Sequence, residues 1–111
     1  MEKIRTIVLN PALAALLGFA RKARQVEGGF EAVRRGIEKQ KIAFVLVDDS
    51  LAENSFKKIL AAAHQHQTPL LRVRKEEDIS LLKLSGNKIL GLHHGGLAKG
   101  FWDKLNRSIN V

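Results

Sequence analysis

An uninterrupted apolar run at residues 42–47 is the feature that most constrains the fold of this chain. Ile42, Phe44, Val45 and Val47 belong to it, so branched and aromatic side chains predominate. A strand that is apolar at every position, and not only at alternate ones, is typical of a strand covered by helices on both faces. The run therefore predicts a central strand between two helical layers.

Segments with the spacing of helices lie on both sides of this run. Asn10 followed by Pro11 predicts a helix start, because Asn caps free N–H groups and proline has no N–H to leave unpaired. Ser50 followed by Glu53 is typical of a capping box, and acidic residues at 76–78 suit the first turn of another helix. The expected helices cover residues 11–24, 30–39, from the Ser50 cap to 66, from 76 onward, and 97–109.

Short apolar strands alternate with these helices in single file. The expected strands are an edge strand at 25–27, the central strand at 42–47, and strands at 70–73 and 88–92, with turns at 68–69 and 86–87 and a loop at 93–96. This order predicts an α/β fold, a three-layer α/β/α sandwich with a small mixed, mostly parallel sheet. A length of 111 residues predicts a single domain spanning residues 1–111.

Composition excludes several classes of protein. Hydrophobic residues make up 45% and charged residues 27% of the chain, which excludes a disordered chain. No apolar run approaches the ~20 residues of a membrane span, and the N-terminus lacks the features of a secretory signal. The absence of cysteine excludes disulfide and thiolate chemistry. We therefore expect a cytoplasmic protein without a membrane partner.

The charge balance points to a polyanionic partner. Nineteen Lys and Arg against eleven Asp and Glu give a net charge of +8. A small domain this basic most often binds nucleic acid. The alternative is a basic surface that only keeps the protein soluble.

Gly28 and Gly29, at the expected start of the second helix, are the strongest candidate for an anion site. Glycines allow close approach of another backbone, and a helix start presents free N–H groups and partial positive charge. Basic residues that could extend this surface are Arg21, Lys22, Arg34 and Arg35. The alternative is a tight strand-to-helix turn beside a solvated basic face.

Glu31 is a carboxylate within this basic segment. It could accept hydrogen bonds from the edge of a base and so supply selectivity. The alternative is that an acidic residue in the first helical turn only stabilises the helix dipole.

The run Gly28-Gly29-Phe30-Glu31-Ala32-Val33-Arg34, followed by the strand at 42–47 and the pair Asp48-Asp49, resembles the kink-turn RNA-binding ribosomal protein superfamily. Within it, the chain is most similar to the small bacterial YlxQ branch. The family motif reads Gly, any residue, Asn, Glu, two residues, Lys, and stands at the start of the second helix. The resemblance covers about residues 13–105, and the family's fold is the same α/β/α sandwich.

The resemblance implies roles for two segments. Gly28 and Gly29 would approach the RNA backbone at a sharp bend, Glu31 would accept hydrogen bonds from a guanine, and Arg34 would contact base or phosphate. A second contact, with an extruded nucleotide, would come from the loop formed by Leu84, Ser85, Gly86, Asn87 and Lys88.

Two positions depart from the family pattern. Phe30 stands where the motif has Asn; it could join the core, as the helical spacing favours, or stack on a base. Arg24 stands where related chains often have a glycine that ends the first helix.

No arrangement of residues predicts catalysis. His64 and His66 are two apart on an expected helix, so their side chains diverge and cannot share a metal, and no nucleophile has a base beside it.

We expect no enzyme, cofactor or metal. We expect instead a monomer that binds structured RNA, ribosomal RNA among the candidates, in association with ribosomes or another ribonucleoprotein. The alternative is a protein-interaction adaptor with a decayed RNA site, favoured by Phe30 and by an expected exposed Trp102; an accessory domain of RNA-modifying enzymes ranks last.

Overall fold

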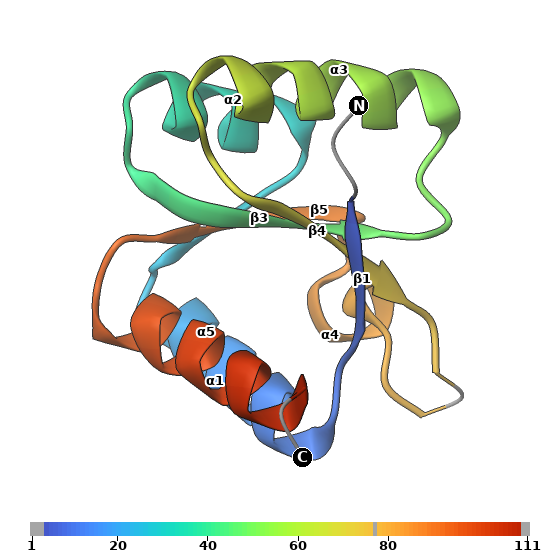
Figure 1. The fold of residues 1–111 in the computed structure, drawn as a ribbon, viewed down its shortest axis with the longest axis vertical. Helices are drawn as coiled ribbons and strands as arrows, with labels where there is room; N and C mark the ends of the chain where they lie inside the picture. Colours follow the sequence, from blue (N-terminus) through green and yellow to red (C-terminus); the bar gives the residue numbers. More distant parts are fainter. Residues whose placement is uncertain (1–3, 77, 110–111) are drawn as a thin grey trace.

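A five-stranded sheet forms the middle layer of the molecule (Figure 1). The computed structural model describes residues 4–76 and 78–109. The strands, in the order β1-β4-β3-β5-β2 across the sheet, are β1 (Arg5–Val8), β2 (Val26–Gly28), β3 (Ile42–Asp48), β4 (Leu70–Arg74) and β5 (Ile89–His93). The helices are α1 (Pro11–Lys22), α2 (Phe30–Glu38), α3 (Glu53–Gln65), α4 (Leu81–Ser85) and α5 (Gly96–Ile109).

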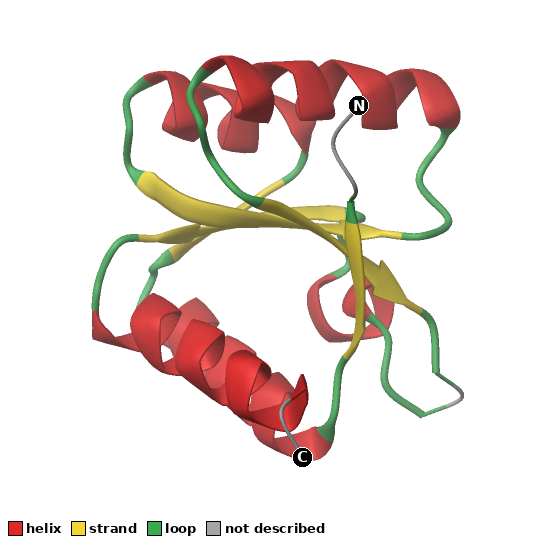
Figure 2. Ribbon diagram, viewed as in Figure 1, coloured by secondary structure: helices red, strands yellow, loops and turns green. Residues whose placement is uncertain are grey.

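Helices cover both faces of the sheet, which confirms the predicted three-layer α/β/α sandwich. α2 and α3 pack on one face, and α1, α4 and α5 lie on the other (Figure 2). β3 separates two apolar clusters, because its side chains alternate between the faces. Phe44 and Leu46 join the cluster beneath α1 and α5, whereas Val45 and Val47 join the cluster beneath α2 and α3. The uninterrupted apolar run is explained by this double burial.

The sheet is mixed, but parallel pairs do not predominate. β4 pairs in parallel with β1 and β3, whereas β5 pairs antiparallel with β3 and β2. A parallel connection needs a crossover of a dozen or more residues, usually a full helix. The connection from β4 to β5 contains only the 5-residue helix α4, and β5 starts at the end of the sheet where β4 finishes, so it runs antiparallel to β3. β2 occupies an edge of the sheet, as predicted.

Both ends of the first helix follow its sequence. The Asn10 side chain accepts a hydrogen bond from the Leu13 N–H at 2.8 Å, with Pro11 in the first turn, so the predicted start of α1 is confirmed. α1 ends at Lys22, two residues before the expected boundary.

The expected capping box of the third helix is wrong. α3 begins at Glu53, and its N-cap residue, Ala52, has no side-chain capping bond. The Ser50 hydroxyl instead donates to Asp48 Oδ1 at 2.6 Å. Ser50 is therefore used in the turn that ends β3.

The fourth helix begins later than expected. Ser80 is its N-cap residue, and the Ser80 hydroxyl accepts from the Lys83 N–H at 3.1 Å. Glu76 and Asp78 precede the helix, and Glu77 lies outside the described residues. A single Ser cap satisfies the helix start, so the acidic run is not needed there.

β1 was not expected from the sequence. In this strand Ile7 is buried while Thr6 is exposed. β5 includes His93, which the sequence placed in a loop. None of the described helices combines the length and apolar character that crossing a membrane requires.

Candidate nucleic-acid interface

Gly29 starts α2 and holds the helix end against β5. Its φ of 93° lies in a region that favours glycine. The Gly29 N–H donates to the Ile89 carbonyl at 2.9 Å. No side chain caps α2. We call residues 28–31 the α2 tip; it presents helix N–H groups that no side chain covers by hydrogen bonding.

Residues 84–88, the second segment expected at the interface, lie against the α2 tip. A Cβ atom at Gly28 would come within 2.6 Å of Asn87 Nδ2, and one at Gly29 within 3.7 Å of Asn87 Oδ1. A contact within the protein itself, with Asn87, therefore explains why residue 28 is a glycine. The structure brings together two segments that are more than fifty residues apart in the sequence.

The 84–88 loop is tied together by its own hydrogen bonds. The Ser85 hydroxyl lies 2.7 Å from the Leu81 carbonyl and 2.9 Å from the Asn87 carbonyl, donates its single proton to one of them, and accepts from the Asn87 N–H at 3.1 Å. Gly86, with a φ of 73°, ends α4 in the left-handed region. Leu84 is half-buried against the core beneath α1 and α5.

Arg21 joins the same surface from α1. Its Nη1 donates to the Leu84 carbonyl. Arg21 also lines a hollow of about 180 Å³ together with Val26, Gly28, Ser85, Asn87 and Leu90. Lys22, the neighbouring candidate, is exposed at the end of α1 and does not line this hollow.

Lys88 connects the interface to the end of β3. Lys88 Nζ donates to the Ser50 carbonyl at 3.4 Å. Asp48, 4% exposed, accepts from the Ser50 N–H at 2.9 Å and the Leu82 N–H at 3.4 Å. Burial by itself would raise the pKa of the Asp48 carboxyl, but hydrogen bonds from Ser50 and Leu82 and the Lys88 charge outweigh it and hold that pKa below its usual value. Asp48 thus fixes the start of α4 beside the interface.

Arg34 is bracketed by two carboxylates of its own helix. Its Nη2 lies 2.7 Å from Glu31 Oε2, and its Nη1 lies 3.0 Å from Glu38 Oε2. The hydrogen bond and charge of Arg34 lower the pKa of Glu31, and Glu31 in turn raises the pKa of Arg34. The spacings of three and four residues that allow these pairs are visible in the sequence, and the sequence-based prediction overlooked them. Arg35 is exposed and belongs to none of the ion pairs found among residues 4–76 and 78–109.

Phe30 packs into the protein. It is half-buried against the cluster that includes Val33, Ile37 and Ile42, as its helical spacing predicted. Trp102, in contrast, was expected to be exposed, and this is wrong. The indole is half-buried, with its ring centroid 5.3 Å from that of Phe44.

The histidines form no metal site within the described part of the chain. No group of three or more His, Cys, Asp or Glu side chains in residues 4–76 and 78–109 could hold a metal ion. His93 Nε2 lies 2.8 Å from Glu27 Oε2 and links the two strands at that edge of the sheet.

Comparison with known proteins shows the fold. No protein-family model matches the chain, and no curated protein matches it in sequence. A protein of unknown function from Bacillus halodurans superposes with a TM-score of 0.74 and 21% identity, over 87% of this chain and 99% of that one. A 15.5 kD RNA-binding protein from Giardia lamblia superposes with a TM-score of 0.66 and 10% identity, over 90% of this chain and 92% of that one. The α/β sandwich of this chain is therefore a fold that a known RNA-binding protein also has.

Proposed function

We propose that this protein binds folded RNA through the α2 tip, the 84–88 loop and Arg21. One observation carries the proposal. The glycine-led and uncapped start of α2 lies directly against the 84–88 loop. Helix N–H groups, the Glu31 carboxylate and basic side chains from separate segments thus share one end of the sheet. The Giardia protein of the same fold and the net charge of +8 support an RNA ligand.

The groups at this site divide into those that bind phosphate and those that read bases. The free N–H groups of the α2 tip suit a phosphate, since they combine donors with the positive end of the helix dipole. Arg21, Lys22, Arg35 and Lys88 would neutralise further phosphates. Glu31 has one oxygen, Oε2, bound to Arg34, while the other is available to accept from a guanine, as the family resemblance implies.

Arg34 would have to exchange partners to contact RNA. Both of its terminal nitrogens are bound to carboxylates in the free protein. We propose that Arg34 orients Glu31 and moves one nitrogen to the RNA on binding. Specificity for kink-turns and association with a ribosome or another ribonucleoprotein are the finer part of the proposal, and they rest on the resemblance of residues 28–34 to the family motif.

Two glutamates that both pair with Arg34 allow a matched test. Glu31→Gln and Glu38→Gln each remove one negative charge beside Arg34, but only Glu31 lies at the α2 tip. Affinities would be measured by gel shift for a kink-turn RNA and for a straight duplex of the same length. We expect Glu31→Gln to reduce the preference for the kink-turn about tenfold. Glu38→Gln should raise both affinities slightly and leave the preference unchanged.

Two results would contradict the proposal. Equal weak binding of the wild-type protein to both RNAs would remove kink-turn specificity and favour the adaptor function. Equal gains for both RNAs with both variants would show that Glu31 acts only as a repulsive charge.

A further inference from the structure

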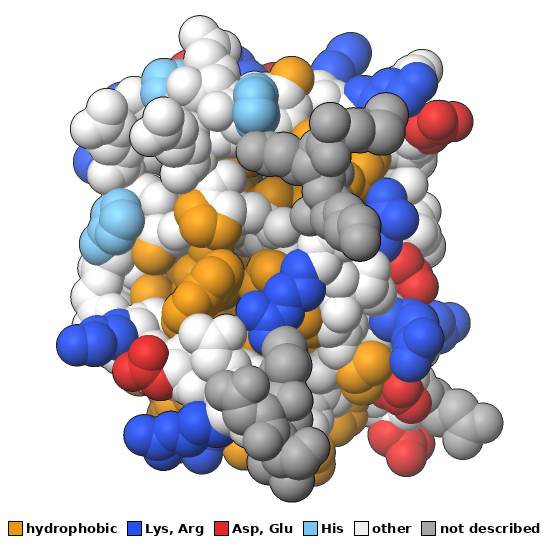
Figure 3. Space-filling model, viewed as in Figure 1, with side chains coloured by type: hydrophobic (Ala, Val, Ile, Leu, Met, Phe, Trp, Pro, Cys, Tyr) orange, Lys and Arg blue, Asp and Glu red, His pale blue; other side chains and the backbone are white. Residues whose placement is uncertain are grey.

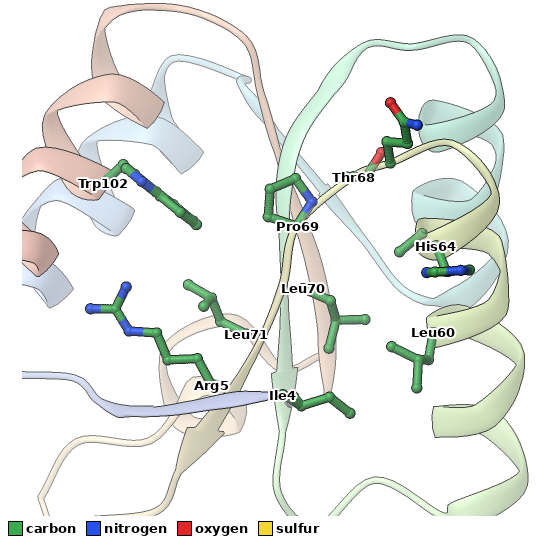
Figure 4. A pocket seen from close by; sticks show the side chains of 11 residues that line it. Ile4, Arg5, Leu60, His64, Thr68, Pro69, Leu70, Leu71 and Trp102 are labelled. Carbon is green, nitrogen blue, oxygen red and sulfur yellow. The ribbon is translucent and has the colours of Figure 1, made fainter. Parts of the chain in front are cut away.

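A second hollow, of about 680 Å³, lies where β1 and β4 begin. It crosses the start of β4, from Trp102 of α5 on one side to Leu60 and His64 of α3 on the other (Figure 4). We call it the β4 groove. Apolar side chains line it from Ile4, Leu60, Pro69, Leu70, Leu71 and Trp102, and polar side chains line it from Arg5, His64, Gln67 and Thr68.

The β4 groove and the RNA interface are at opposite ends of the sheet. Leu70, the first residue of β4, pairs with Val45, three residues before Asp48 at the end of β3. Asp48, Lys88 and Gly28 mark the other end, where β3 and β2 finish and β5 starts. The RNA interface therefore does not account for the groove.

Arg5 places an unsatisfied donor in the wall of this groove. Arg5 Nη1 donates to Asn106 Oδ1 at 3.2 Å. Arg5 Nη2 is buried, and it has no hydrogen-bond partner among the described residues. A buried guanidinium donor without an acceptor is unfavourable, so a ligand that brings an acceptor to Arg5 gains a hydrogen bond there. Arg5 as a whole is only half-buried, so its guanidinium can turn toward the groove.

The strand beside the groove, β1, also has an edge with no neighbouring strand among the described residues. β1 is at the edge of the sheet and pairs with β4 alone among the described strands. Its outer backbone groups could therefore pair with an added extended segment. Figure 3 shows hydrophobic side chains gathered in the middle of the face that carries β1, a basic side chain among them and other basic side chains toward the margin.

We propose that the β4 groove binds an extended segment of a partner protein in which an Asp or Glu adjoins an aliphatic or aromatic residue. The segment crosses the start of β4, its apolar residue packs beside Trp102 and Leu71, and its carboxylate accepts from Arg5. An acidic segment also complements the net charge of +8. A second copy of this chain has the same net charge of +8, so charge complementarity does not favour it as the occupant.

A single-stranded RNA fits the groove less well. Proteins that bind it combine several cations along the backbone with aromatic platforms. Arg5 is the one Lys or Arg among the residues that line this groove, and Trp102 already packs against Phe44 with its ring tilted by 48°.

Trp102 is the only tryptophan of the chain, and there is no tyrosine, so its fluorescence reports on this groove. Random peptides displayed on phage would be selected against the full-length protein, and the enriched peptides synthesised. We expect enriched sequences with an acidic residue beside an apolar one, and binding that shifts Trp102 emission. Replacing the peptide's Glu by Gln, or Arg5 by Gln, should weaken binding at least tenfold. Lys39→Gln, which removes an exposed charge from the end of α2, should change it less than twofold.

Several outcomes would overturn the proposal. These are a selection without this pattern, binding that leaves Trp102 emission unchanged, and equal effects of Arg5→Gln and Lys39→Gln. A shift of emission caused by an oligouridine would assign the groove to RNA, and a shift caused by self-association at high protein concentration would assign it to a second copy. Since Arg5→Gln could disturb folding, Leu60→Glu provides a second variant that should repel the same peptides. Kink-turn affinity, measured on both variants, separates failure here from failure of the RNA site.

Discussion

Gly28 and Asn87 form the contact that joins the two halves of the candidate interface. A methyl group at Gly28 would meet Asn87 Nδ2 at 2.6 Å and Cγ at 3.2 Å. Nδ2 itself donates to the Ser85 carbonyl at 3.4 Å, so the Asn87 side chain cannot move without disturbing the loop. We expect Gly28→Ala to lower the free energy of unfolding by about 1–3 kcal/mol, measured by urea denaturation.

A double-mutant cycle checks that the loss comes from this contact. Asn87→Ala removes the group that a methyl at Gly28 would strike, so Gly28→Ala should be much less harmful in that background. Gly18→Ala is the control, because nothing lies within 4 Å of a Cβ there. It should stabilise α1 by about 0.5–1 kcal/mol. Additive losses for Gly28→Ala and Asn87→Ala would show that the two positions are not coupled.

Asp48 should make the stability of the protein depend on pH in the acid range. Its pKa is lowered in the folded state from a usual value of 3.8, so its contribution is present above that value and is lost as the pH falls through the folded pKa. We expect Asp48→Asn to lower the free energy of unfolding by about 1–2 kcal/mol at pH 7. The difference from the wild type should shrink between pH 4 and pH 2 in thermal denaturation.

Asp49→Asn is the matched control for this prediction. Asp49 is exposed, and its carboxylate meets the Lys75 N–H only at 3.5 Å. The substitution should change stability by less than about 0.5 kcal/mol at any pH. A constant difference between wild type and Asp48→Asn down to pH 2 would show that hydrogen bonding of the charged carboxylate is not the source of the effect.

Part of the candidate site could be predicted from single residues. The sequence predicted that Gly29 precedes the second helix and that Glu31 lies in its first turn, because a glycine pair followed by apolar residues at helical spacing indicates a helix start. Both residues have these positions in α2. The contact of Asn87 with Gly28 could not be derived, since it depends on how β2 and β5 align in the sheet. The two ion pairs of Arg34, in contrast, could have been predicted, because Glu31 and Glu38 lie three and four residues from it on one helix.

Three helices end in the same way, with a residue other than glycine in the left-handed region. Arg24, Gln40 and Gln67 have φ values of 59°, 58° and 56°. At each position, the N–H groups of that residue and of the next residue donate to carbonyls in the last turn of the preceding helix. At the end of α2, the Gln40 N–H donates to the Ile37 carbonyl and the Lys41 N–H donates to the Gly36 carbonyl, both at 2.9 Å. The side chains at these three positions are exposed, so the backbone geometry alone determines which residue is best there.

Gln40→Gly should therefore stabilise the protein by about 0.5–1 kcal/mol, since glycine adopts this conformation without the strain of a Cβ. Lys39→Gly, one residue earlier at a φ of −86°, is the control and should lose about 0.5 kcal/mol. The measurement is the midpoint of thermal unfolding. A loss of stability with both glycines would mean that chain entropy outweighs the relief of strain.

At the level of elements, strong local signals predicted structure correctly and weak ones did not. Asn10 before Pro11 located α1, and the apolar run located β3, because both signals are complete within a few residues. β1 was not found, since it has 4 residues and only Ile7 among them is buried. Its strand conformation comes from pairing with β4, which is more than sixty residues away.

Across the whole molecule, the sheet separates two candidate surfaces of different chemistry. The end formed by β2, β3 and β5 carries helix N–H groups and cations, whereas the end where β1 and β4 begin carries a groove of mixed apolar and polar lining with a single arginine. Because the two surfaces are separate, the two proposals together predict that one molecule binds RNA and a protein segment at the same time.

The net charge of +8 by itself would attract RNA to the entire surface, so salt dependence must show whether the interface is local. If Arg21, Lys22, Arg35 and Lys88 each neutralise one phosphate, the logarithm of the association constant should fall with the logarithm of salt concentration with a slope of about −3 to −4. Lys88→Gln should make that slope shallower by about one. Lys57→Gln, on α3 and 3.5 Å from Glu53, should leave it unchanged. Equal changes from both variants, in titrations from 50 to 300 mM salt followed by fluorescence anisotropy, would mean that the charge of the whole molecule, and not the α2 tip, holds the RNA.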